Sequence, residues 1–240
     1  MRNERGGQSE IPYPENLLKV IENYKSGPPT PETVTAYWKA KMDFEGRKAR
    51  RDIRVSQCTW NEREIQSPMF DIHGNPIEGM MVYVGKKFTK EDGYSFLGKI
   101  FPKLSSVVTP PYYYQDTIPN SGWVKVEATI SSPNLGTNEE EIAKIQAEYG
   151  YQGQRLITYI LASYASKDLI GQHFDHSSRP VDEWTRSRLA GSLTNEGLIC
   201  IADMYSEGSV HTNPRTTPDN RNPHRGARFE QTSPSLSGVI

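Results

Sequence analysis

The chain of 240 residues has few cysteines, no long apolar run and almost no net charge. Its two cysteines, Cys58 and Cys200, are too few for a disulfide framework or for a zinc site of their own. No apolar run approaches the ~20 residues of a membrane helix, and the polar start of the chain lacks the apolar core of a signal peptide. We therefore expect a cytoplasmic or virion protein that is not secreted through a signal peptide and has no membrane partner.

The net charge of −1 gives the chain no global field that would attract a nucleic acid, so any such binding must come from local basic patches. Hydrophobic residues make up only 35% of the chain, yet aromatic residues reach 10%. Disordered chains are poor in aromatic residues, so this composition predicts a folded core with polar extensions.

Familiar catalytic motifs are missing as well. The sequence contains no P-loop, dinucleotide fingerprint, nucleophile elbow, HExxH or CxxC pair. An acid-x-Lys nuclease pattern fails because Glu127 follows Lys125 instead of preceding it. No reaction can be named from motifs, so the sequence favours a protein that is not an enzyme and uses no cofactor.

Apolar residues at helical spacing predict a mostly helical core. We expect helices over residues 17–26, 31–53, 86–104, 138–169 and 181–208. Thr30 followed by Pro31 is typical of a helix start. Alternating polar and apolar residues predict a clear strand over 123–131 and a second strand over 78–85.

These elements predict a fold that is mainly α with a small β component, an α+β class. Residues 1–16 are expected to form an N-terminal arm, and residues 17–208 a mostly helical core domain with a small sheet. Residues 209–240 are expected to form an extended C-terminal arm. From residue 211 onward this segment holds four prolines and few large apolar residues, which is typical of a chain that forms no core.

The stretch GQHFDHSSRP contains His173 and Asp175, a His-x-Asp pair. Followed by a distant histidine, either His211 or His224, this is the ligand pattern of a non-haem iron triad. With Arg221 available for a 2-oxoglutarate carboxylate, the chain resembles the non-haem Fe(II)/2-oxoglutarate oxygenases at these few positions. That resemblance implies a β-barrel around the iron, whereas the intervening segment is predicted to be helical. We therefore favour a polar loop between helices and expect no metal.

Two basic clusters point to a polyanion, because arginine binds phosphate with a planar fork. Arg155 and Arg186 lie within expected helices, where they pair with an acid such as Asp203 or line a groove. A solvated helix face and a polar tail remain the alternative for the two clusters. The predicted nucleic-acid-binding residues are Arg47, Lys48, Arg50, Arg51, Arg54, Arg155, Arg186, Arg221, Arg225 and Arg228.

Aromatic and terminal apolar residues are the candidates for contacts between subunits. Exposed tyrosines, as in TPPYYYQD, supply rigid contact area at protein interfaces and can also stack on bases. The predicted interface residues are Tyr112, Tyr113, Tyr114, Phe229, Leu236, Val239 and Ile240.

A helical core between polar arms resembles, at the level of class, the coat or nucleocapsid proteins of filamentous viruses. That resemblance implies a self-assembling structural protein, a subunit of a filament or shell, with itself as first partner and RNA or DNA as second. Head-to-tail contacts would build a ring or an open helix. Two alternatives stay open: an iron oxygenase that uses His173 and Asp175, and a subunit tied by its arms into a larger hetero-complex.

Overall fold

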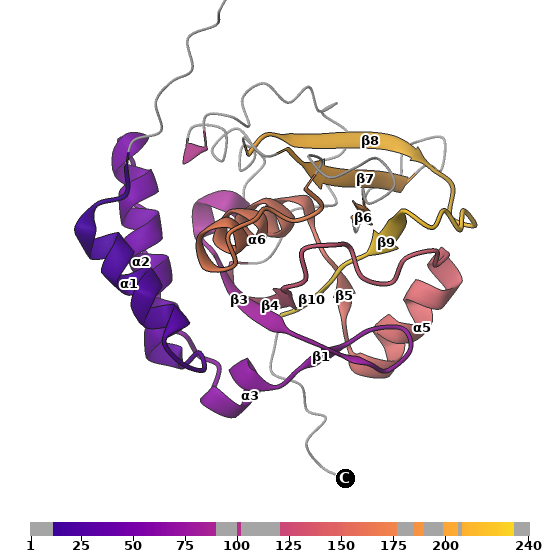
Figure 1. The fold of residues 1–240 in the computed structure, drawn as a ribbon, viewed down its shortest axis with the longest axis horizontal. Coiled ribbons are helices and arrows are strands. Elements are labelled where there is room, and N and C mark those ends of the chain that lie inside the picture. The colour runs from indigo at the N-terminus through magenta and orange to yellow at the C-terminus, as the bar shows by residue number, and fades with distance from the viewer. Residues whose placement is uncertain are drawn as a thin grey trace, which may run out of the picture.

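The structure is a computed structural model that describes residues 12–89, 100–101, 121–176, 185–189, 199–205 and 208–232. It is 37% helix and 22% strand, and its strands form three sheets, two of which have four strands. Figure 1 shows the two N-terminal helices at one end of the molecule and another helix, residues 139–149, at the opposite end, with the two larger sheets between them. The predicted helical core with a small sheet is therefore wrong, because strands contribute a large part of the fold.

The helices are α1 (Glu15–Lys25), α2 (Pro31–Lys48), α3 (Glu62–Gln66), α5 (Glu139–Tyr149) and α6 (Leu156–Leu169), and η1 (Lys86–Thr89) is a 3-10 turn. The side chain of Thr30 accepts a hydrogen bond from the backbone N–H of Thr33, at 3.3 Å, and caps α2. The predicted helix start at Pro31 is thus confirmed. Within the described parts of the chain, no helix is long and apolar enough to cross a membrane.

A buried polar cluster attaches the first two helices to α6. Lys41 of α2 lies 2.8 Å from the Asp168 carboxylate, which also accepts hydrogen bonds from Tyr37 and Tyr13. Burial lowers the pKa of Lys41, but Asp168, Tyr13 and Glu45 together raise it by more, so the lysine stays protonated. Tyr13 belongs to the predicted N-terminal arm, of which residues 1–11 lie outside the described residues. The end of that segment is thus anchored to the domain.

The central sheet has the order β3-β4-β10-β5 and is antiparallel throughout. Its strands are β3 (Gly79–Val84), β4 (Gly122–Glu127), β10 (Phe229–Gln231) and β5 (Gln152–Gly153). Helix α6 is buried along most of its length and packs on β3, so the main core lies between the helices and this sheet. A separate short hairpin pairs β1 (Met69–Phe70) with β2 (Pro76–Ile77). The two strands predicted from alternation are present as β3 and β4.

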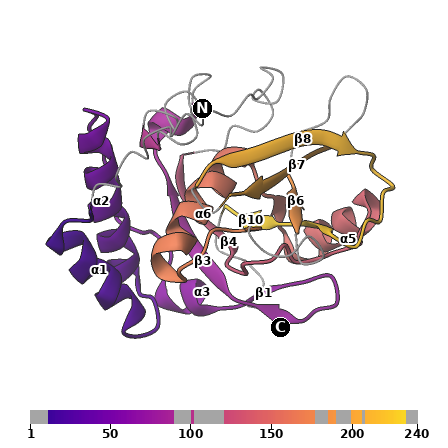
Figure 2. The same cartoon turned by 45° about the horizontal axis from the view of Figure 1, so that its top comes forward.

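The second sheet has the order β8-β7-β6-β9 and lies on the other side of α6 from α1 and α2 (Figure 2). Its strands are β6 (Arg186–Arg188), β7 (Ile199–Met204), β8 (Val210–Thr216) and β9 (Arg225–Ala227), and only β6 and β9 run parallel. The helix predicted over 181–208 is wrong in its described parts, which form β6 and β7. Ile201 and Ala202 point to opposite faces of β7 and both are buried, and a short run that is apolar on both faces cannot be distinguished from a buried helix by periodicity.

The predicted C-terminal arm is a second error of the fold prediction. Residues 210–231 supply β8 and β9 to the second sheet and β10 to the middle of the central sheet. The segment was interpreted as an arm because it has few apolar residues. It is buried through polar side chains instead: Arg228 and Glu230 are both 0% exposed and pair with partners elsewhere in the chain.

Candidate functional site

Strand β6 separates two polar clusters, because its successive side chains point to opposite sides of the sheet. Ser187 faces the interior, whereas Arg186 and Arg188 face the other side. The parallel register pairs Arg186 with Arg225 of β9 and Ser187 with Gly226, so both arginines of the first pair share one side. A Cβ at Gly226 would lie 2.0 Å from the carbonyl oxygen of Pro133, which leaves room only for glycine on the inner side.

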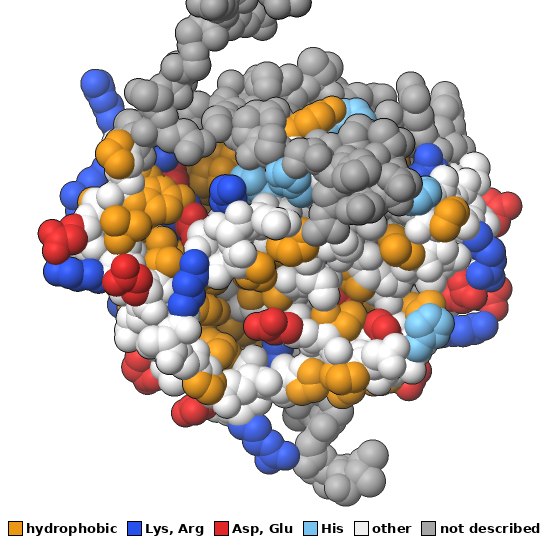
Figure 3. All heavy atoms as spheres, in the orientation of Figure 1, with side chains coloured by type: hydrophobic (Ala, Val, Ile, Leu, Met, Phe, Trp, Pro, Cys, Tyr) orange, Lys and Arg blue, Asp and Glu red, His pale blue; other side chains and the backbone are white. Residues whose placement is uncertain are grey.

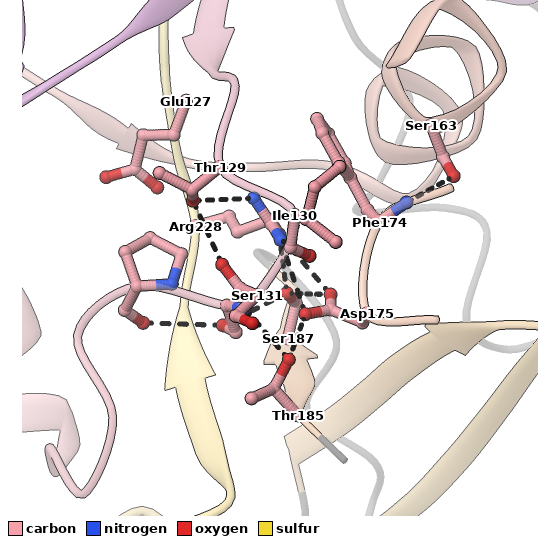
Figure 4. A network of polar contacts seen from close by, with 12 residues as sticks. Glu127, Thr129, Ile130, Ser131, Ser163, Phe174, Asp175, Thr185, Ser187 and Arg228 are labelled. Atoms are coloured by element: carbon pink, nitrogen blue, oxygen red, sulfur yellow. Dashed lines mark hydrogen bonds and ion pairs between the residues drawn. The ribbon is translucent and has the colours of Figure 1, made fainter. Parts of the chain in front are cut away.

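The inner cluster is centred on Asp175 (Figure 4). Its carboxylate accepts hydrogen bonds from Thr185 (2.7 Å), Ser187 (2.6 Å) and Tyr159 (3.1 Å). The guanidinium of Arg228 lies 3.3 Å from it, and both side chains of this ion pair are 0% exposed. The carboxylate is thus surrounded by donors from α6, β6 and the segment before β10.

Arg228 holds several segments together from the same position. Its guanidinium donates to the Ile130 carbonyl at 3.0 Å and to the Ser187 hydroxyl at 2.8 Å, and it lies 4.1 Å from the centre of the Phe174 ring. Asp175 itself has a left-handed backbone, with φ of 48°, and its N–H donates to the same Ile130 carbonyl. A closed cluster of this kind fixes the chain and has no surface on which a ligand could bind.

Two residues that the sequence assigned to different sites therefore pair with each other: Asp175, a candidate metal ligand, and Arg228, a candidate for nucleic acid. His173, the other half of the His-x-Asp pair, is buried with Nδ1 3.1 Å from the Ser163 hydroxyl. Burial lowers the pKa of His173 to about 4, so it is neutral at pH 7. Across the described ranges, no group of three or more His, Cys, Asp or Glu side chains is placed to hold a metal.

On the outer side of the second sheet, one titratable or charged residue from each strand lies at the same level. The register pairs His211 of β8 with Asp203 of β7, and Arg186 of β6 with Arg225 of β9. The register of β6 with β7 places Arg186 opposite Asp203. His211, Asp203, Arg186 and Arg225 thus form a straight line across the sheet, which we call the charged row.

Two side chains of the charged row meet on one carboxylate oxygen. His211 Nδ1 lies 3.0 Å from Asp203 Oδ1, and Arg186 Nε lies 3.6 Å from the same oxygen. The Asp203 side chain is 4% exposed, whereas His211 is 38% and Arg186 is 30% exposed. Since a carboxylate only accepts, Nδ1 donates and Nε2 is left as the basic nitrogen of the ring. The imidazole and the guanidinium therefore converge above a buried acid.

Positive charge accumulates at the β9 end of the charged row. Burial lowers the pKa of the Arg225 guanidinium, and the charges of Arg186 and Arg188 lower it further. Arg188 is itself buried and pairs with Glu139 of α5 at 3.0 Å. Its Nε has no hydrogen-bond partner among the described residues. Because Arg186 and Arg188 are each paired with a carboxylate, the remaining repulsion acts on Arg225, and an anion bound there would relieve it.

An exposed aromatic ring lies beside the His211 end of the charged row. Tyr205 follows β7 directly and is 39% exposed, and its ring packs edge-on against His211 with 6.2 Å between the ring centres. Two backbone hydrogen bonds, from Tyr205 to Ser209 and from Gly208 to Tyr205, fix the turn that carries it. A tyrosine face next to basic groups is the arrangement on which a nucleobase can stack.

The other predicted basic residues are distributed over the surface or used inside the fold. Those near the end of α2 are exposed, and three of them pair with nearby acids: Arg47 with Asp43, Lys48 with Glu45 and Arg54 with Asp52. Arg50 and Arg51 are exposed just beyond α2. Figure 3 shows positive and negative side chains mixed over this face of the molecule. Arg221 pairs with Glu141 at 2.9 Å, and Arg155 pairs with the buried Glu230 at 2.7 Å.

Of the ten predicted nucleic-acid residues, the structure brings Arg186 and Arg225 together on paired strands. Arg186 pairs with Asp203, one of the alternatives that the sequence left open for it, although it lies on a strand and not on the expected helix. Arg188 and Tyr205 were not predicted, and His211 was considered only as a metal ligand. Alternation along 210–216 could have placed His211 on one side of a strand, but 199–204 is apolar on both faces and gives no signal that sets Asp203 opposite it.

The predicted subunit contacts are mostly outside the described residues, where Tyr112, Tyr113, Tyr114, Leu236, Val239 and Ile240 lie. Phe229, the remaining one, is 0% exposed and packs in a core with Tyr151 and α5. Its side chain is thus used within this chain. In comparisons with protein families, curated proteins and solved structures, the chain shows no significant match.

Proposed function

We propose that the chain binds single-stranded nucleic acid through the charged row and Tyr205. The observation that carries this proposal is the pairing of Arg186 with Arg225 on adjacent parallel strands. Arg188 lies two residues beyond Arg186 on the same side of β6. Guanidinium groups form strong, charge-assisted hydrogen bonds to phosphate oxygens. Because these cations already repel one another, a phosphate gains both new hydrogen bonds and relief of that repulsion.

The length of the row favours a polymer over a single phosphate. Four strands spaced by about 4.8 Å give a row of roughly 14 Å from His211 to Arg225. Tyr205, two residues beyond Asp203 and directly after β7, adds an exposed ring beside His211, and stacking on such rings contributes to single-strand binding without sequence preference. A chain with one base on Tyr205 and a neighbouring phosphate on the arginines would follow the row.

The coat-like subunit expected from the sequence remains a prediction. In such an assembly, this binding site would hold the enclosed RNA or DNA. Its contacts between subunits cannot include Phe229, which is buried in its own core. Sedimentation of the purified protein together with its 260/280 nm absorbance ratio measures assembly and bound nucleic acid at once. A monomer free of nucleic acid would contradict the coat-like role.

Binding can be tested by charge reversal in the row. We expect the double variant Arg186→Glu/Arg225→Glu to bind a fluorescently labelled single-stranded oligonucleotide at least tenfold more weakly at low salt. Loss of two phosphate contacts should also make the slope of log affinity against log salt concentration shallower by about 1.4. Fluorescence anisotropy over a salt series measures both quantities, with RNA and DNA of one sequence.

The matched control reverses two arginines outside the row, Arg47→Glu/Arg54→Glu, which were predicted from sequence to bind nucleic acid. We expect this control to retain most of the affinity, and circular dichroism should show the same fold for both variants. Equal affinity of the row variant and the natural chain would remove the charged row from the binding site. A loss confined to the control would move the site to the end of α2.

A further inference from the structure

The charged row contains the parts of an acid–base centre as well as those of a phosphate site. Asp203 is buried and fixes the His211 ring through Nδ1, so that Nε2 can accept a proton. A carboxylate that orients an imidazole in this way is a recurring component of catalytic sites. Arg186 approaches the same carboxylate oxygen, so a phosphate bound to Arg186 would lie next to the imidazole.

We propose that this arrangement cleaves RNA, an activity that rests on the nucleic-acid binding proposed above. His211 Nε2 removes the proton of a ribose 2′-hydroxyl, and the 2′ oxygen attacks the adjacent phosphorus. The bond between phosphorus and the 5′ oxygen breaks, and that oxygen receives the proton from the imidazolium. The products are a 2′,3′-cyclic phosphate and a 5′-hydroxyl, and no water, oxidant or reductant is consumed.

The two arginines have a defined task in this step. Negative charge increases on the non-bridging oxygens as phosphorus becomes five-coordinate, and preorganised donors aimed at that charge lower the barrier. The register of β6 and β9 places Arg186 and Arg225 side by side, and Arg186 is oriented further by its ion pair with Asp203. Asp203 is a positioning residue, because it acts through the ring of His211.

The mechanism selects RNA over DNA by chemistry and not by affinity. The nucleophile belongs to the substrate, since only ribose carries the 2′-hydroxyl that attacks. The chain therefore has to supply a base and cations, both of which are present in the row. DNA of the same sequence, or RNA with a 2′-O-methyl group at the scissile position, would bind and stay intact.

The test incubates end-labelled single-stranded RNA with excess protein and follows the products by gel electrophoresis and mass spectrometry. We expect the natural chain to produce fragments that end in 2′,3′-cyclic phosphate. His211→Ala should reduce the cleavage rate by at least about 100-fold, which is far more than the loss of affinity for the uncleaved 2′-O-methyl RNA that follows from removing one side chain of the charged row. Asp203→Asn should also reduce the cleavage rate, because the His211 ring loses the carboxylate that orients it.

A second variant separates a catalytic from a structural role. His211→Gly leaves space for free imidazole, and added imidazole should restore part of its cleavage rate with no change in thermal stability. Cleavage that persists unchanged in His211→Ala would overturn the proposal. So would a His211→Gly variant that cleaves RNA as fast without imidazole as with it. If the natural chain binds RNA without cleaving it, this inference fails while the binding function stands; if it binds no RNA, both fail.

Discussion

The two sides of strand β6 use the same residue types for opposite purposes. On the inner side, Asp175 and Arg228 lie 3.3 Å apart, both 0% exposed, and three hydroxyl groups complete the shell of the carboxylate. On the outer side, Asp203 and Arg186 lie 3.6 Å apart, and the arginine remains 30% exposed. The two ion pairs have nearly the same separation between their charged atoms. Burial and the number of additional donors therefore decide whether such a pair fixes the fold or stays available to a ligand.

That difference has an energetic meaning. Removing one partner of a fully buried pair leaves an uncompensated charge in the interior, whereas an exposed pair contributes little because water replaces the lost partner. Mutations on the inner side should therefore change stability, and mutations on the outer side should change binding and leave stability nearly intact. The experiments below test this division in order of decreasing expected effect.

The largest effect is expected from ending the chain at Gly208. This removes β8, β9 and β10, and with them Arg228 from the inner cluster and half of the charged row. We expect no cooperative thermal transition by circular dichroism. A chain that ends after Thr232 retains all three strands and should unfold cooperatively. A folded chain that ends at Gly208 would show that residues 210–231 form a dispensable arm after all.

Next in size is the single change Arg228→Met. It leaves the Asp175 carboxylate without its cation, and we expect the free energy of unfolding to fall by about 3–5 kcal/mol. Urea denaturation followed by fluorescence measures the change. The double variant Asp175→Asn/Arg228→Met should be less destabilised than the sum of its single changes, because no charge is left buried. Additive losses would indicate that the two residues stabilise the fold independently.

An effect that reaches a comparable size only near pH 8 is due to Glu127 of β4, which is 0% exposed and accepts a hydrogen bond from the Phe229 N–H at 2.9 Å. Burial raises its pKa from 4.5 to about 8. The folded chain thus keeps this proton between those two values while the unfolded chain releases it, so stability falls as pH rises through that window.

The variant Glu127→Gln tests the sign of that dependence. It cannot ionise, so the difference in unfolding free energy between variant and natural chain should grow by up to about 1.4 kcal/mol per pH unit from pH 5 to pH 8. Denaturation at several pH values measures this difference, and Glu15→Gln, at an exposed position, serves as a control without such a slope. A constant difference would mean that Glu127 is ionised in the folded chain.

The smallest effect on stability is expected on the outer side. Arg186→Ala should change the unfolding free energy by less than about 1 kcal/mol, because its ion pair with Asp203 is partly exposed. The same variant should weaken nucleic-acid binding measurably by fluorescence anisotropy. A loss of stability as large as that of Arg228→Met would contradict the division between the two sides of β6.

Local signals in the sequence predicted the elements that are stabilised locally. Thr30 and Pro31 identify the start of α2, and strict alternation identifies β4. The C-terminal strands escaped prediction because their burial depends on distant partners, such as Arg228 and Asp175, which are 53 positions apart. The charged row exists only through the register of four strands, and neither composition nor spacing along the chain contains that register.

The position of β10 in the central sheet determines when that sheet can be completed. β10 lies between β4 and β5, two strands that the ribosome has already released by the time residues 229–231 are made. At about 5–20 residues per second, some 76 positions of synthesis separate the end of β5 from the start of β10, so both strands wait for several seconds with unpaired edges. Such open edges can pair with strands of other chains, so the nascent chain is exposed to aggregation until β10 arrives.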